Sequence, residues 1–192
     1  MNNTPVVQQP RRRPLWLVGA LTVLSLGAYI PIWYGLSWAE LKRETDDGGS
    51  SPMARGTGDA GMQPLAHALS IFVPVYGVWQ AYRHFALIDA LRRKVDAARG
   101  VDALTGAIGT GIWWLTFTHY SSEPIFQALD AIELAAGTAV ILYGQRGLNA
   151  YWRARPGTPV AERVTEVDWV ALGVAASFAF LTLVGALMGP AS

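Results

Sequence analysis

The sequence predicts an all-α membrane protein, a polytopic bundle of about five transmembrane helices. Apolar residues form long blocks without an ionisable side chain, at residues 15–39, 104–117 and 169–192. A membrane-spanning helix needs about 20 mainly apolar residues, because the hydrocarbon core is roughly 30 Å thick. Of the 192 residues, 52% are hydrophobic and only 15% are charged. This is more apolar surface than a soluble core of this size would bury.

The first helix is expected at residues 15–38, after a basic N-terminal tail at residues 1–14. Three consecutive arginines precede the apolar stretch, as in a secretion signal. The stretch is too long for such a signal and contains no small-x-small cleavage site, so it reads as a retained signal anchor. Trp16 and Trp38 lie near its two ends, where aromatic rings favour the headgroup level. Residues 45–64, rich in Gly, Ser, Asp and Pro, predict a flexible loop.

Four further helices follow in the apolar pattern. They are expected at residues 65–90, 103–120, 123–148 and 168–192, with a linker at 153–167. Pro74 interrupts the first of these, and the Ser-Ser-Glu-Pro sequence before the third is typical of a helix start. We expect residues 15–152 to form one membrane domain, to which 168–192 adds a C-terminal helix.

Basic residues predict the orientation, because cytoplasmic loops carry the excess of Lys and Arg. With five spans and a cytoplasmic N-terminus, the C-terminus lies outside. Twelve of the fifteen basic residues then lie inside, and Lys42, Arg43 and Arg55 lie outside. In an alternative threading, the stretches around Pro31 and Pro74 form two re-entrant hairpins beside three spans. That alternative places all fifteen inside, but irregular backbone exposed to lipid is costly, which favours five crossings.

Two segments resemble each other within the chain. Residues 24–44 and 69–93 share a Leu-Ser start, a proline within the apolar stretch, a tyrosine followed by a tryptophan, and a charged exit. Internal repeats of this kind occur in transporters. Convergence explains the similarity equally well, since aromatic and charged residues recur wherever helices leave a membrane.

Three short motifs resemble a prokaryotic membrane family known as domain of unknown function 4234. They are a Leu-Gly-Ala-Tyr, Trp-Tyr and Glu-Leu series, a second-helix pattern, and a Tyr-x-Gln-x-x-Leu-Asn-x-x-Trp motif. The residues that carry the resemblance are Gly27, Tyr29, Trp33, Pro74, Tyr82, Arg83, Gln145, Leu148, Asn149 and Trp152. The resemblance covers about residues 15–152 and implies a membrane location and a helical architecture. It implies no activity, cofactor or catalytic residue.

A polar group within the predicted membrane region is the candidate site. Gln127, Asp130 and Glu133 are three residues apart on the fourth helix and so lie on nearly one face. His67 and His119 are expected at the outer ends of the second and third helices, on the same level. Such a group suggests a proton relay or a cation site. Acidic residues in the first turns of a helix are also favoured by its dipole alone, which is the simpler explanation.

Basic residues on the cytoplasmic side form a second candidate, a rim for anionic lipid headgroups. The rim consists of Arg92, Arg93, Lys94 and Arg99. An ordinary positive-inside anchor explains it equally well. Gly106, Gly109 and Gly111 are interpreted as close helix contacts, since small residues let backbones approach in lipid.

Other function classes lack their signatures. The chain has no cysteine, no phosphate-binding glycine loop, no nucleophile elbow and no His-Glu-x-x-His motif. The net charge of +1 argues against nucleic-acid binding. We therefore expect a multi-pass protein of a bacterial inner membrane that is not an enzyme and has no metal or cofactor. Its partners would be the bilayer and a membrane protein or a second copy. The function favoured is that of an accessory or scaffold component, and the alternative is a small transporter or proton-coupled channel that uses Asp130 and Glu133.

Overall fold

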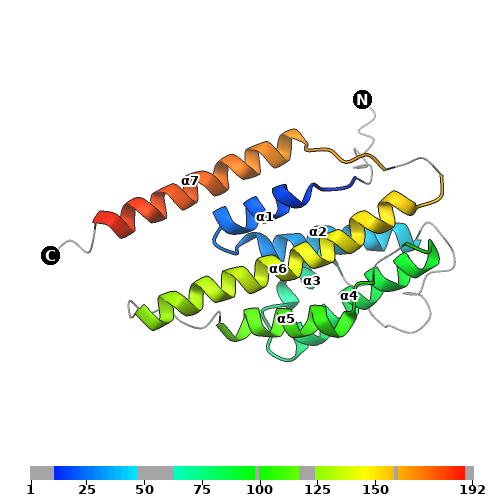
Figure 1. Ribbon diagram of the computed structural model, residues 1–192, viewed down its shortest axis with the longest axis horizontal. Helices are drawn as coiled ribbons and strands as arrows, with labels where there is room; N and C mark the ends of the chain where they lie inside the picture. The colour runs from blue at the N-terminus through cyan, green and yellow to red at the C-terminus, as the bar shows by residue number, and fades with distance from the viewer. Residues whose placement is uncertain (1–10, 47–62, 98–99, 117–123, 158–159, 189–192) are drawn as a thin grey trace.

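The computed structural model describes residues 11–46, 63–97, 100–116, 124–157 and 160–188, which form seven helices and no strand. The all-helical prediction is thus confirmed for this part of the chain (Figure 1). The helices are α1 (Leu15–Leu24), α2 (Tyr29–Asp46), α3 (Pro64–Ser70), α4 (Tyr76–Lys94), α5 (Ala103–Thr116), α6 (Pro124–Ala154) and α7 (Glu166–Met188).

The predicted first helix, residues 15–38, is a hairpin of two helices. Leu26 and Gly27 adopt positive φ angles of 49° and 88°, which reverse the chain between α1 and α2. The Gly27 amide donates to the carbonyl of Thr22 at 2.8 Å and so closes the end of α1. Pro31 lies in the first turn of α2, where a helix needs no amide donor. The proline therefore starts the second arm of a hairpin instead of kinking a long helix.

The predicted second helix, residues 65–90, is also a hairpin. Residues 71–75 separate α3 from α4 and contain Pro74 and a positive φ of 60° at Val75. A Cβ added to Gly77 would lie 2.6 Å from the carbonyl oxygen of Ile71, so the two arms meet closely at the turn. The Leu-Ser pair shared by the two similar segments lies at the end of the first arm of each hairpin. The shared proline follows it, within the first turn of α2 in the first hairpin and just before α4 in the second.

Two helices of the described chain, instead of about five, are long and apolar enough to cross a membrane. They are Ile125–Ala154 and Glu166–Gly185, and only a small share of the apolar stretch within each is buried against the rest of the protein. The five-span prediction is corrected because the turns divide two of the expected spans, and because α5 is described over only 14 residues. The other expected helices appear near their predicted bounds, although α6 continues to Ala154.

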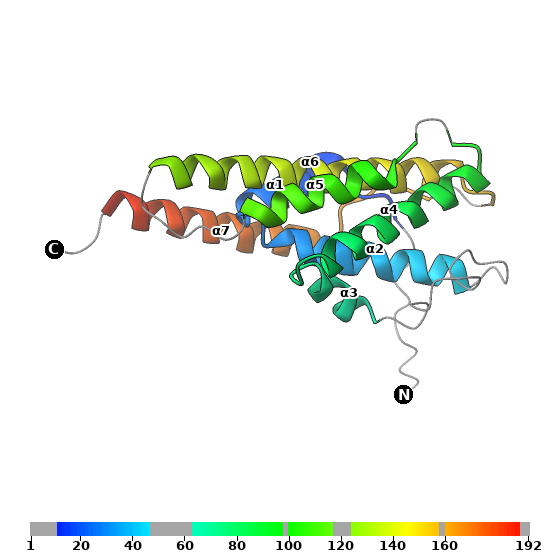
Figure 2. The same ribbon diagram turned by 90° about the horizontal axis from the view of Figure 1, so that it is seen from below.

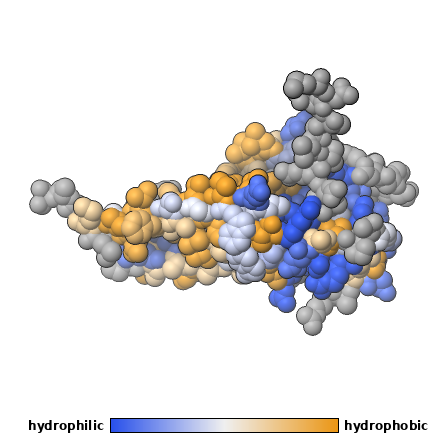
Figure 3. Space-filling view, turned by 90° about the horizontal axis from the view of Figure 1, so that it is seen from above, coloured by the Kyte–Doolittle hydropathy of each residue, from blue (hydrophilic) through white to orange (hydrophobic). Residues whose placement is uncertain are grey.

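Charge separates the two ends of the molecule. The described Lys and Arg residues, Arg83 excepted, lie before α1, in the later halves of α2, α4 and α6, and between α6 and α7. Figures 1 and 2 show that these segments share one end, whereas α6 and α7 extend farthest toward the other. Hydrophilic residues accordingly gather at one end of the surface in Figure 3, and the elongated remainder is mainly hydrophobic.

The core lies where α2, α4 and α6 pack together. Trp33 and Phe85 are fully buried there. A Cβ added to Gly144 of α6 would lie 2.5 Å from the Trp33 ring and 2.9 Å from the Phe85 ring, and one added to Gly106 of α5 would lie 2.2 Å from Phe85. Small residues on α5 and α6 therefore make room for large rings, in agreement with the close helix contacts expected for α5.

Candidate functional site

Two histidines meet in the interior between α2, α3 and α4. His67 projects from α3 and His84 from α4, and neither side chain is exposed. Ser37 and Trp38 of α2 complete the surroundings, and both are buried. The short α3 can pack this closely on α2 because Gly35 of α2 leaves room, where an added Cβ would lie 3.1 Å from Ala68. We refer to His67 and His84 as the histidine pair.

The histidine pair forms part of a linear hydrogen-bonded chain. His67 Nε2 lies 2.9 Å from His84 Nδ1, and His84 Nε2 lies 3.2 Å from the Ser37 hydroxyl. That hydroxyl donates to the carbonyl of Trp33 at 2.6 Å. Because Ser37 uses its proton there, His84 must donate through Nε2 and accept at Nδ1 from His67. His67 Nδ1 is then a buried lone pair, and it has no hydrogen-bond partner.

Aromatic rings enclose the pair. Trp38 stacks on His67 with ring centroids 3.9 Å apart, and Tyr34 packs edge-on against His84 at 5.0 Å. Helices α3 and α4 lie outside the two candidate membrane spans. Burial lowers the pKa of His67 to about 3, and burial together with His67 lowers the pKa of His84 well below its ordinary value. Both rings are therefore neutral at pH 7.

This geometry links helices more readily than it performs chemistry. The described residues contain no group of three or more His, Cys, Asp or Glu side chains placed to hold a metal ion. The hydrogen-bonded chain ends on a backbone carbonyl of α2, so it joins the second hairpin to the first. A buried polar network whose members are paired gives a core a unique arrangement. The histidine pair accordingly sets the positions of α3 and α4 relative to α2.

A second buried network joins α2 and α6 to the segment before α1. The Trp33 indole donates to Gln145 Oε1 at 2.8 Å, and Gln145 Nε2 donates to Asn149 Oδ1 at 2.9 Å. Asn149 Nδ2 in turn donates to the carbonyl of Arg13 at 2.7 Å. The Arg13 guanidinium donates two hydrogen bonds to the Glu40 carboxylate, at 2.6 and 3.3 Å, and this ion pair is buried.

Most residues of the family-like motifs thus serve the packing. Leu148 and Trp152 lie in the core, Gly27 and Pro74 lie at the two hairpin turns, and Tyr29 is buried at the start of α2. Tyr82 is partly exposed on α4, and the Arg83 guanidinium lies over the Trp79 ring at 5.8 Å.

The arginines before α1 contact carboxylates. Arg11 binds Asp168 at the start of α7, with one hydrogen bond of 2.8 Å, and Arg12 lies 3.5 Å from Glu162. Asp168 also accepts hydrogen bonds from Thr165 as that helix begins. Over its described residues, the segment that was expected to be a basic tail therefore binds α2 and α7.

The polar membrane site does not assemble around His67 as expected. His67 faces His84, and α3 makes no contact with α6 in the described chain. Gln127 and Asp130 are exposed on the first half of α6, and Glu133 is half-buried. His119 lies outside the described residues. The expectation failed because the second hairpin turns back between α3 and α4, which places His67 in the interior.

The predicted headgroup rim is partly internal. Arg92 is buried, donates to the carbonyl of Ala97 at 2.6 Å and lies 3.5 Å from Asp89. Arg93 is exposed but pairs with Asp89 at 2.7 Å. Lys94 is exposed, and Arg99 lies outside the described residues. One carboxylate thus balances two of the four basic residues.

Comparisons with known proteins find no match. Neither a family model, nor a curated protein, nor a solved structure is similar to the chain. The resemblance to domain of unknown function 4234 therefore stays a prediction from its motifs. Sequence reasoning missed His84, Ser37, Glu40 and Asp168 as partners in buried contacts. A polar residue within an otherwise apolar stretch was the available signal for His84 and Ser37.

Proposed function

We propose that the chain is a membrane-embedded scaffold or accessory component that enters the bilayer from one side. The observation that carries this proposal is the separation of charge: one end holds nearly all described basic residues, while α6 and α7 extend from it with apolar, little-buried surfaces. Surfaces of this kind mark membrane or partner contact. In this arrangement the charged end faces the cytoplasm of a bacterial cell.

The hairpin alternative then describes the threading. Helices α6 and α7 and the apolar stretch that begins with α5 cross, and the two hairpins enter and return without crossing, so that all basic residues stay on the cytoplasmic side. The direction of each described helix supports this (Figure 2). The turn side chains are exposed, with Leu26 at 49% and Val75 at 84%. Backbone amides of both turns nevertheless donate within the chain, Gly27 to Thr22 at 2.8 Å and Val73 to Ser70 at 3.0 Å, and such internal hydrogen bonds reduce the cost of a turn in lipid.

The scaffold role is supported by the use of the buried polar groups. The histidine pair and the Trp33–Gln145–Asn149 network each connect one helix to another. Such links give a defined helical framework. We propose that the framework holds a membrane protein partner or a second copy against the exposed faces of α6 and α7.

Cysteine labelling in intact cells tests the threading, and the absence of native cysteine makes it clean. Ser50, Ser122 and Ser192 are replaced singly with Cys and exposed to a membrane-impermeant maleimide. The hairpin threading predicts labelling of Ser122→Cys and Ser192→Cys and protection of Ser50→Cys. Permeabilised cells, in which all three positions should react, are the control. External labelling of position 50 would overturn the hairpin threading in favour of five crossings, and recovery of the chain in a detergent-free supernatant would overturn the membrane location.

A carrier that uses Asp130 and Glu133 is the second candidate. The observation in its favour is that Asp130 is exposed on a helix apolar enough to cross a membrane, where a bare carboxylate is costly. Replacing Glu133 with Gln keeps the size of the side chain and removes its charge. A scaffold carrying this change should keep its abundance and partners, whereas a proton-coupled carrier should lose its flux.

A further inference from the structure

A cavity of about 750 Å³ lies at the charged end of the molecule. It is bounded by the start of α1, the second half of α6 and the segment that precedes α5. Leu15, Trp16 and Tyr143 provide apolar and aromatic walls, and Arg146 and Arg153 provide positive charge. The cavity is distinct from the histidine pair, and its two arginines are not part of the predicted headgroup rim.

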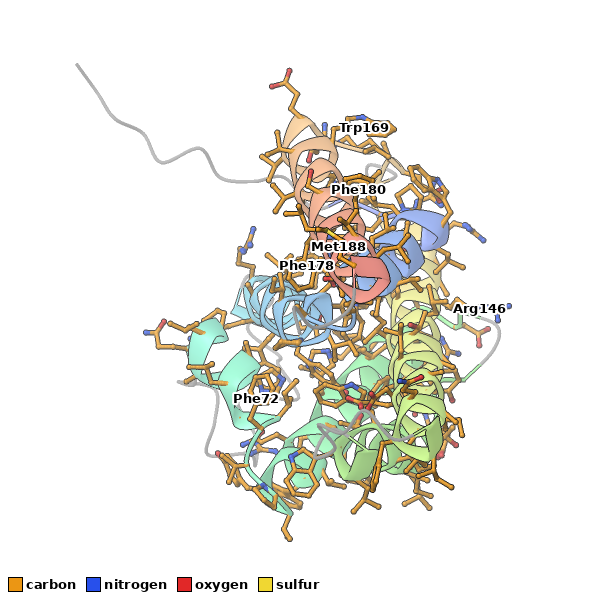
Figure 4. All side chains as sticks on the ribbon, turned by 90° about the vertical axis from the view of Figure 1, so that its left-hand side faces the viewer. Phe72, Arg146, Trp169, Phe178, Phe180 and Met188 are labelled. Atoms are coloured by element: carbon orange, nitrogen blue, oxygen red, sulfur yellow. The ribbon has the colours of Figure 1, made fainter. Side chains whose placement is uncertain are left out.

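The two arginines of the cavity are unusual among the described basic residues. Arg146 and Arg153 have no ion pair or side-chain hydrogen bond within the described chain, whereas Arg11, Arg13 and Arg155 each bind a carboxylate. Both are exposed, and Figure 4 shows the Arg146 side chain projecting away from the bundle. Their spacing of seven residues puts them on one face of α6, about 10 Å apart along its axis. Two flexible arginines at this distance can reach one anion.

One acidic residue, Glu162, also lines the cavity. Its carboxylate lies 3.5 Å from Arg12, whose Nε donates to the carbonyl of Val160 at 2.8 Å. Within the described chain, no carboxylate forms an ion pair with Arg146 or Arg153. A guanidinium offers paired donors that match phosphate oxygens.

The cavity lies beside the apolar surface, and this position indicates the chemistry of the rest of the ligand. Trp16 lines the cavity and lies 6.2 Å from Trp169 of α7, measured between ring centroids. Both indoles are more than half exposed. Tryptophans of this kind favour the boundary between headgroups and acyl chains. Beyond Trp169, the exposed Phe178, Phe180 and Met188 continue along α7 (Figure 4).

We propose that this cavity binds the phosphate group of an anionic amphiphile. Arg146 and Arg153 hold the phosphate oxygens, and Leu15 and Trp16 contact the first apolar carbons. The inference rests on the proposed membrane location for its natural ligand, a phospholipid. A water-soluble phosphate compound would use the same two arginines, so the source of the phosphate is part of the test.

The test uses the full chain, purified in a neutral detergent and freed of lipid. Phosphatidylglycerol with brominated acyl chains is titrated in mixed micelles. Because the chain has 8 tryptophans, the part of the fluorescence quenching that is lost in Trp16→Phe reports binding near Trp16. Brominated phosphatidylcholine, which has no net charge, and inorganic phosphate as a competitor are the parallel arms. We expect saturable quenching by phosphatidylglycerol. Phosphatidylcholine should bind about tenfold more weakly, or more weakly still, since charge-assisted hydrogen bonds carry the affinity.

Variants locate the binding in this cavity. Arg146→Gln and Arg153→Gln should each weaken phosphatidylglycerol binding about tenfold. Arg163→Gln, an exposed arginine that does not line the cavity, should leave it unchanged. Near-ultraviolet circular dichroism confirms that the variants remain folded.

Equal binding of both lipids, or full binding by the Arg146→Gln/Arg153→Gln double variant, would overturn the proposal while leaving the membrane scaffold intact. Competition by inorganic phosphate at equal concentration would support the arginine site and assign it to a soluble phosphate. A chain that needs no detergent would overturn the membrane location, and the phosphate arm would still decide the site.

Discussion

A chain with Glu40 replaced by leucine should lose about 3–5 kcal/mol of unfolding free energy, because Arg13 is left charged and buried without its partner. The Arg13 and Glu40 side chains are only 4% and 9% exposed. Burial raises the pKa of the Glu40 carboxyl, while the charge and hydrogen bonds of Arg13 oppose that rise. Arginine cannot shed its proton to escape burial. Replacing Glu40 is therefore expected to lower the unfolding free energy more than replacing Arg13.

The measurement is a denaturation of the detergent-solubilised chain, followed by near-ultraviolet circular dichroism. For a protein of this size the loss corresponds to a fall in melting temperature of roughly 6–20 °C. The double variant Arg13→Met/Glu40→Leu should recover most of it, because no buried charge remains. Arg93→Gln, which removes the exposed member of the ion pair with Asp89 and leaves Asp89 beside Arg92, is the control and should cost about 1 kcal/mol or less. An equal cost for Glu40→Leu and Arg93→Gln would show that Arg13 is not buried.

Acidification from pH 7 to pH 5 should destabilise the fold by about 2 kcal/mol or more through the histidine pair. In the folded protein, burial keeps the pKa of His67 near 3 and holds that of His84 well below 6.5. The unfolded chain binds protons at its histidines below pH 6.5, whereas the folded chain does not. Stability is therefore full above pH 6.5 and falls as the pH decreases below it. At pH 5 His67 contributes a loss of about 2 kcal/mol, and His84 contributes a further loss of the same sign.

A double variant isolates this effect. His67→Phe keeps a ring to stack on Trp38, and His84→Leu fills a similar volume without a titrating group. Ser37 retains its hydrogen bond to the Trp33 carbonyl in this variant. Its melting temperature should change less between pH 7 and pH 5 than that of the unaltered chain. Parallel curves for the two proteins would mean that the histidine pair is protonated, or open to water, in the folded state.

The two hairpins show where reasoning from the sequence stopped. Hydropathy averages over a window of about one bilayer thickness, so a turn of four or five residues inside an apolar stretch changes the average little. The local signals at the turns were present as Gly27 and Pro74, but each also occurs within transmembrane helices. The distribution of basic residues, which favoured hairpins, was outweighed by the general cost of irregular backbone in lipid. Hydrogen bonds within each turn reduce that cost, and these bonds are not visible in a linear pattern.

The candidate site shows the same limit. From the sequence, His67 was expected at the outer end of the second helix, and His84 was not among the candidate residues. Their pairing depends on the reversal between α3 and α4 and on the close approach of α3 to α2, which brings residues 17 positions apart within 2.9 Å. Spacing along the sequence therefore identified polar residues, but it could not identify the residues that they contact.

The sequence alone determined the helical class, the apolar character of the protein, the helices near residues 103, 124 and 166, and the concentration of positive charge beside the apolar blocks. Each of these depends on composition or on a periodicity within one segment. The tertiary structure decided the hairpin turns, the histidine pair, the Arg13–Glu40 ion pair and the cavity with two unpaired arginines. Each of these depends on which helices pack together, because a buried polar group is stabilised only by a partner that the fold brings to it.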